Sequence, residues 1–157
     1  MPGFPSGPRP TDSGRHAASA AVPPIPVVPS HWTFPAHPAS VRRARRAVSE
    51  ALPYGCRSQL ADGLRLLTSE LVTNAVTHGA RAEDDEVIEM ILWAADGHYW
   101  LAVSDPGVGN PARTPAAPDA EGGRGLLLVN AVAAAWAVVP RPVRGKSVVA
   151  GVPLHGG

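Results

Sequence analysis

The feature that most constrains this chain is a long helical pattern that ends at Gly79. Its apolar residues repeat at spacings of three and four, as on one buried helix face: Leu60, Leu64, Leu67, Leu71 and Ala75. At about 100° per residue, Glu70, Asn74 and His78 fall inside or beside the same stripe. Because burying an unpaired charge is costly, two interpretations stay open. The last two turns come to the surface, or Glu70 and Asn74 point together into a polar pocket.

Length and composition bound the class of protein. The 157 residues suffice for one domain with a core and some tail, and a formal net charge of +1 gives no argument for a nucleic-acid or membrane partner. The single cysteine, Cys56, excludes an internal disulfide framework, and the six histidines lack metal-ligand spacing. No apolar run approaches the roughly 20 residues of a membrane span, and prolines break the apolar stretch over residues 17–28. We therefore expect a soluble, cytoplasmic protein without a signal peptide.

The N-terminal region differs in composition from the rest. Residues 1–30 are rich in Pro, Gly, Ser and Ala, so we predict a disordered tail there and a folded domain over residues 31–157. Residues 31–35 alternate and predict a short edge strand that Pro35 stops. A helix is expected from Pro38 to Pro53 with Ser40 as its cap. Its cluster of arginines favours a solvated face over a site for an acidic partner or nucleic acid: Arg42, Arg43, Arg45 and Arg46.

The remaining pattern predicts the fold class. The long helix spans residues 57–78, and two strands over 86–95 and 98–105 are joined at Asp96-Gly97, a strong hairpin signal. Both faces of this hairpin are mostly apolar, as in the middle of a covered sheet. A helix over residues 126–135 and strands over 136–139 and 147–154 complete the chain. We predict an α+β, two-layer sandwich with a mixed, mostly antiparallel sheet and helices on one face.

Two glycine-rich stretches are candidates for binding a ligand. In the first, Asp105-Pro-Gly-Val-Gly109, Pro106 biases Asp105 toward extended backbone, so that a carboxylate able to accept from an exocyclic amine stands at a strand end. The second, Gly122-Gly-Arg-Gly125, opens a helix whose free amides and arginine suit an anion such as phosphate. Either stretch taken alone also fits simple turn chemistry.

Three rival motifs are excluded. Residues 107–112 satisfy the loose dinucleotide pattern, but prolines at positions 111, 115 and 118 forbid the helix that this fingerprint requires. The chain contains neither a Walker Gly-x4-Gly-Lys-Ser/Thr motif nor the Gly-x-Ser-x-Gly elbow of serine hydrolases.

Taken together, three stretches resemble the nucleotide site of the GHKL superfamily, whose ATP-binding domain has the Bergerat, or histidine-kinase-like ATPase, fold. Residues 70–75 (ELVTNA) resemble its N box, residues 105–109 (DPGVG) its first glycine box and residues 123–129 (GRGLLLV) its second. Within the superfamily the chain most resembles stand-alone anti-sigma-factor serine/threonine kinases of actinobacterial type. The resemblance covers residues 31–154.

The resemblance implies roles for four polar residues. It implies that Asn74 coordinates a Mg²⁺ ion that bridges the phosphates of ATP, since an amide oxygen suits a hard cation. It implies that Asp105 accepts from adenine N6, with Ser147 as a water-mediated helper. Glu70 would be the catalytic general base that deprotonates an incoming serine or threonine hydroxyl.

It also implies roles for both glycine boxes. Gly107 and Gly109 would let the loop approach the nucleotide. Gly123, Arg124 and Gly125 would cover the phosphates as a lid.

The function implied by the resemblance is an ATP-dependent protein kinase. Its substrate would be an anti-sigma-factor antagonist, and it would also sequester a sigma factor and dimerise through its first strand and helix. The alternative is a non-catalytic ATP-binding module that sequesters a regulatory partner, and a third possibility is a sandwich that binds no nucleotide. The chain departs from histidine kinases in having no phosphoacceptor helix pair, so autophosphorylation on histidine is not expected. It is also too short for the transducer domain of other superfamily ATPases.

Overall fold

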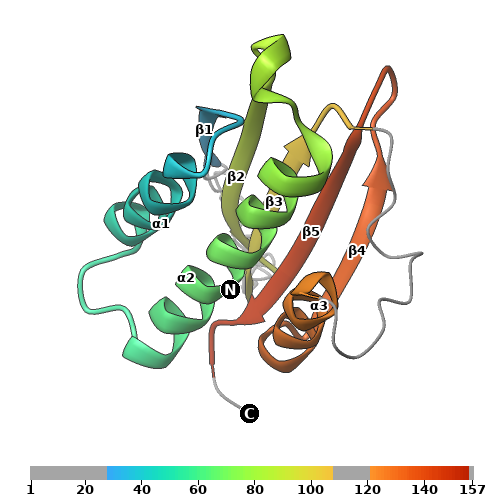
Figure 1. The fold of residues 1–157 in the computed structure, drawn as a ribbon. Coiled ribbons are helices and arrows are strands. Elements are labelled where there is room, and N and C mark those ends of the chain that lie inside the picture. Colours follow the sequence, from blue (N-terminus) through green and yellow to red (C-terminus); the bar gives the residue numbers. More distant parts are fainter. Residues whose placement is uncertain (1–27, 108–120, 156–157) are drawn as a thin grey trace, which may run out of the picture.

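The computed structural model describes residues 28–107 and 121–155, which form a five-stranded sheet with three α-helices against one face (Figure 1). The elements in chain order are β1 (Ser30–Pro35), α1 (Ala39–Ala51), α2 (Ser58–Asn74), the π-helical turn η1 (Ala75–Gly79), the 3₁₀ turn η2 (Ala82–Asp84), β2 (Val87–Ala95), β3 (His98–Asp105), α3 (Glu121–Val132), β4 (Ala135–Pro140) and β5 (Lys146–Pro153). The predicted α+β sandwich is confirmed. Of the predicted tail, residues 1–27 lie outside the described part of the chain.

The strand order is β1-β2-β3-β5-β4, which makes β1 an edge strand as predicted. All four pairings are antiparallel, where the sequence suggested a mixed sheet. The hairpin between β2 and β3 turns at Asp96 and Gly97, whose positive φ angles of 51° and 73° are those of the predicted two-residue turn. Because β5 returns between β3 and β4, the end of β3 lies beside the start of β5.

The core lies between the helices and the sheet. Leu64, Leu67 and Leu71 of α2 are at most 2% exposed, and they join Ile88 and Leu101 of the sheet in one apolar cluster. Each such buried side chain contributes roughly 1.5–3 kcal/mol of transfer free energy. The apolar stripe predicted for this helix is therefore the main contact between the two layers.

The opposite face of the sheet differs from the prediction of a sheet covered on both sides. Ile91 and Trp93 are only half-buried there, and in the described part of the chain the helices lie on the other face (Figure 1). Trp93 pairs across the strands with Trp100, whose ring lies against the backbone of Gly151. The apolar residues on this face partly shield one another without a second layer of helices.

The N-terminus of α1 is built differently from the prediction. Its N-cap is Pro38, and the ring Nδ1 of His37 accepts from the backbone N–H of Ala39 at 3.0 Å. Ser40, predicted as the cap, is buried and donates its hydroxyl to the carbonyl of Pro35 at 2.6 Å. Ser40 therefore links the helix to the end of β1, and the prediction of a Ser40 cap was wrong because it did not foresee this partner.

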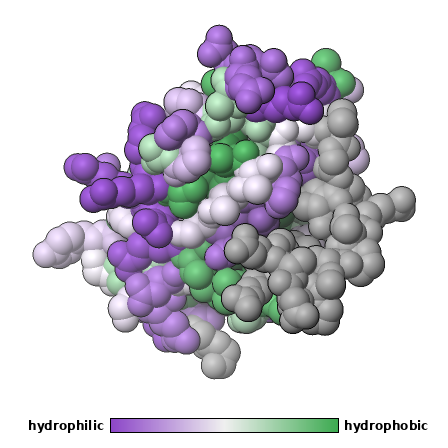
Figure 2. Space-filling model, in the orientation of Figure 1, coloured by the Kyte–Doolittle hydropathy of each residue, from purple (hydrophilic) through white to green (hydrophobic). Residues whose placement is uncertain are grey.

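The arginines of α1 lie on an exposed face, and Figure 2 shows hydrophilic residues along the side where this helix lies. Arg46 pairs with Glu50 at 2.8 Å, and Arg43 lies over the ring of Phe34 with 5.6 Å to its centroid. These local contacts agree with a solvated face. Among the residues described, no helix has both the length and the apolar character needed to cross a bilayer.

Candidate functional site

The end of α2, the end of β3 and the β4–β5 turn come together in the upper part of Figure 1, and Asp105 lies at this point. Asp105 is the last residue of β3 and is buried. Glu70 and Asn74 occupy the last two turns of α2, and η1 carries the chain from that helix to the end of β3. The topology thus joins two of the three stretches that the sequence singled out.

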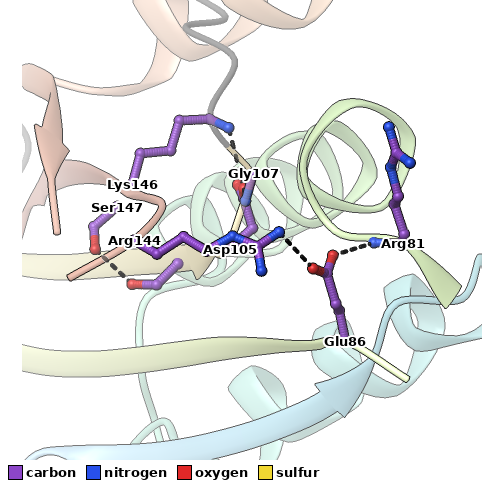
Figure 3. Close-up of polar contacts among 8 residues, drawn as sticks. Arg81, Glu86, Asp105, Gly107, Arg144, Lys146 and Ser147 are labelled. Atoms are coloured by element: carbon purple, nitrogen blue, oxygen red, sulfur yellow. Dashed lines mark hydrogen bonds and ion pairs between the residues drawn. The ribbon is translucent and has the colours of Figure 1, made fainter. Parts of the chain in front are cut away.

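The Asp105 carboxylate is held by two donors. Its side chain is 3% exposed, and Oδ1 accepts from the backbone N–H of Gly107 at 2.8 Å and from Nζ of Lys146 at 3.1 Å (Figure 3). The first contact is a local turn of the kind that Asp often makes with the residue two positions later. The second is a buried ion pair, because the Lys146 side chain is itself only 9% exposed.

Two glycines let two chain segments, η1 and the end of β3, approach closely at this point. A Cβ atom at Gly79 would overlap the Asp105 carboxylate, and one at Gly107 would overlap the backbone of Gly79. Only a residue without a side chain permits such a close approach. The predicted role of Gly79 was to end the helix; the structure adds that it forms one wall around Asp105.

Glu70 and Asn74 are half-buried, as expected for side chains that line an opening rather than a dry core. They lie one helical turn apart, about 6 Å along the axis. His78, the third polar residue of the stripe, is exposed. The chain follows a π-helical turn there, in which the N–H of Ala80 reaches the carbonyl of Ala75 at 2.8 Å. The wider turn changes the helical phase, and such turns occur often at functional sites.

The donor set fits Mg²⁺ bound together with a phosphate ligand. Within the described residues, no group of three or more His, Cys, Asp or Glu side chains could hold a metal ion. Mg²⁺ commonly binds through one or two protein oxygens plus substrate phosphates. The amide oxygen of Asn74 is an oxygen donor of that kind.

The register of β3 against β5 separates Ser147 from Asp105. Asp105 is paired with Lys146, and Ser104 with Ser147. Paired residues share a face of the sheet and successive residues alternate, so Ser147 faces away from Asp105. Its hydroxyl lies 2.6 Å from that of Ser104 (Figure 3). Lys146 is the strand neighbour of Asp105 that the sequence analysis missed, and the water-mediated role of Ser147 stays a prediction.

Glu86 connects the segment after η1 with the β4–β5 turn, beside this site. Its side chain is 10% exposed and accepts from Arg144 at 2.9 Å and from the backbone N–H of Arg81 at 2.6 Å (Figure 3). Next to it, Glu89 accepts from Arg141 at 3.2 Å. These contacts join the segment after η1 to the β4–β5 turn, which leads into Lys146.

The remaining predicted residues are only partly located. Gly109 lies outside the described residues, and Gly123, Arg124 and Gly125 belong to the first turns of α3. That helix begins at Glu121 rather than at the predicted position 126, so the second glycine box lies inside the helix. A cavity of about 420 Å³, lined by apolar residues such as Leu60 and Val152 and also by Arg57 and Asp62, lies at the other end of α2 from Asn74. It contains none of the candidate residues.

Comparison with known proteins gives one family and one fold. A family model described as histidine kinase-like ATPase domain matches residues 34–150, an interval that contains Glu70, Asn74, Asp105 and Lys146. A solved histidine kinase domain, from a blue-light activated histidine kinase of Erythrobacter litoralis, is similar with a TM-score of 0.51 and 24% identity over 77% of this chain. The chain spans 62% of the length of that domain, and the likeness concerns the fold. No curated protein matches the sequence.

Proposed function

Because the chain belongs to the family of histidine kinase-like ATPase domains, we propose that it binds ATP with Mg²⁺ and transfers the γ-phosphate to a serine or threonine of a partner protein. Membership of the GHKL superfamily, expected from the three motifs, is thereby established. The observation that carries the proposal is the buried Asp105 carboxylate, packed against Gly79 at the end of the helix that bears Glu70 and Asn74.

Each residue has a defined task in this proposal. Asp105 accepts a hydrogen bond from the exocyclic amine of adenine. Asn74 would hold Mg²⁺, which would supply positive charge beside the phosphates. The hydroxyl oxygen of the partner bonds to the γ-phosphorus while the bond to the bridging oxygen of ADP breaks, and Glu70 accepts the hydroxyl proton. Gly123, Arg124 and Gly125 at the start of α3 cover the phosphates, since helix N-terminal amides favour anions.

The partner we propose is an anti-sigma-factor antagonist that carries the acceptor hydroxyl, with a sigma factor as the protein sequestered, in the cytoplasm. Homodimerisation would use β1 and α1. It is supported by the position of β1 at the edge of the described sheet, where one side of its backbone has no strand partner.

Phosphoryl transfer is tested with γ-labelled Mg-ATP and an antagonist-type protein from the same organism. We expect the wild type to label that protein. Glu70→Gln, which keeps the size of the side chain but cannot accept the proton as a carboxylate does, should lose at least about a hundredfold in rate and keep its affinity for ATP. Equal labelling by both proteins, or none by the wild type, would refute the kinase assignment. A stable complex that survives Glu70→Gln but is lost in Asp105→Asn would indicate the non-catalytic module instead.

A further inference from the structure

Lys146 has no role in the proposed mechanism, yet it is one of the few buried charged residues of the described chain. The register of β5 places it directly opposite Asp105. Its ammonium group lies 3.1 Å from Asp105 Oδ1, and the two side chains are 9% and 3% exposed. A lysine in such a position costs free energy of desolvation unless it is paired, so the pair calls for an explanation.

The protonation state of Asp105 decides what the carboxyl group can recognise. Burial alone favours the neutral carboxylic acid, whereas a cation in contact favours the carboxylate. The neutral acid has one O–H donor and can bind a carbonyl oxygen. The carboxylate is an acceptor only. An adenine presents an amine at its position 6 and a guanine presents a carbonyl oxygen, so the two states of Asp105 suit different bases.

The described residues hold the Asp105 carboxylate through one of its two oxygens. Both the backbone N–H of Gly107 and Nζ of Lys146 donate to Oδ1. The carboxylate is thus anchored at Oδ1 by one backbone donor and one cation.

We propose that Lys146 is a positioning residue that sets the base selectivity of the site: it keeps Asp105 an acceptor-only carboxylate, so the site takes a 6-aminopurine nucleotide and rejects a 6-oxopurine nucleotide. The inference rests on the proposed function, because it concerns the same nucleotide site. It adds the residue that determines which base the site accepts.

The charged groups around Asp105 single out Lys146. Among the described residues, Lys146 of β5 is the charged side chain that contacts the Asp105 carboxylate. From η1, Asp105 meets Gly79, and His78 beside it is exposed. On the β4–β5 turn, Arg144 is paired with Glu86. Removing Lys146 therefore leaves Asp105 without its contacting cation.

The test compares Mg-ATP and Mg-GTP affinities of the full chain for the wild type and three variants, by calorimetry. Lys146→Met removes charge and donor, Lys146→Gln keeps an N–H donor without the charge, and Lys146→Arg keeps the charge. We expect the wild type to prefer ATP, and the ATP-to-GTP affinity ratio to fall about tenfold or more in the Met and Gln variants. Lys146→Arg should restore the ratio. Thermal melting confirms that each variant is folded.

Three results would overturn the inference. They are a wild type that binds ATP and GTP equally, an unchanged ratio in Lys146→Met and Lys146→Gln, and a ratio that Lys146→Arg fails to restore. Each of these leaves ATP binding itself intact. A wild type that binds neither nucleotide overturns the proposed function as well, and the wild-type titration alone decides this point even if the variants do not fold.

Discussion

Replacing Gly79 by alanine tests the packing on which the site depends. The added Cβ atom would overlap the Asp105 carboxylate, which is buried and cannot turn toward solvent without leaving its two donors. We therefore expect Gly79→Ala to displace the carboxylate, to lower the stability of the protein and to weaken nucleotide binding together.

The expected size of the effect depends on the bonds that the displaced carboxylate gives up. A hydrogen bond to a charged group contributes about 1.5–3 kcal/mol, and breaking a buried ion pair costs about 3–5 kcal/mol. The carboxylate can keep part of these interactions after a small shift, so we expect the displacement to lower the free energy of unfolding by about 2–4 kcal/mol. Alanine in a helical position gains about 1 kcal/mol over glycine. The net expectation is a decrease of about 1–3 kcal/mol in the free energy of unfolding.

Urea unfolding and calorimetric titration of Mg-ATP measure the two effects. Gly63→Ala is the matched control, because Gly63 lies in α2 and, among the described residues, its added Cβ would meet side-chain Cγ1 atoms, of Val132 at 3.2 Å and of Val152 at 3.8 Å, and no backbone. That variant should stay within about 1 kcal/mol of the wild type and bind ATP normally. If Gly79→Ala is as stable as the wild type and binds ATP as tightly, the packing of Gly79 against Asp105 does not matter for the site.

Three other positions give further predictions. Leu64→Ala, at a fully buried position in α2, should lower the free energy of unfolding by about 2–5 kcal/mol in urea, and a decrease below about 1 kcal/mol would contradict the core assignment. Asn74→Ala should weaken Mg-ATP binding about tenfold or more and leave Mg²⁺-free ATP binding nearly unchanged; an equal effect in both titrations would remove Asn74 from the metal site. Glu86→Gln should lower the free energy of unfolding by no more than about 1 kcal/mol, because its partner Arg144 is 61% exposed and such ion pairs are weak. A larger decrease in urea unfolding would show that this ion pair holds the two loops together.

The fold could be predicted from the sequence where one local signal dominated. The alternation of β2 and β3 around Asp96-Gly97 predicted both the hairpin and its turn geometry, and the leucine spacing predicted α2. The start of α3 was placed too late because glycines have low helix propensity, and the helix nevertheless begins at Glu121. The predicted cap of α1 was wrong because Ser40 donates to the carbonyl of Pro35 in β1, a contact that no local sequence rule includes.

The candidate site was predicted less completely, for a physical reason. Glu70, Asn74 and Asp105 could be proposed from helical spacing, strand ends and the family motifs. The neighbour of Asp105 depends on strand register, and a shift of one residue exchanges the two faces of a strand. Lys146 and Ser147 are adjacent in sequence, and only the pairing of β3 with β5 shows which one lies beside Asp105.

The role of Asp105 in base recognition is tested most directly by a calorimetric titration of Mg-ATP into the wild type and into Asp105→Asn. We predict one binding site in the wild type and an affinity about ten- to a hundredfold weaker in the variant, since a charge-assisted hydrogen bond becomes a neutral one and the amide can present a donor to the amine. Absence of binding to the wild type, or equal affinity in Asp105→Asn, would contradict the assignment of Asp105 as the residue that recognises the base.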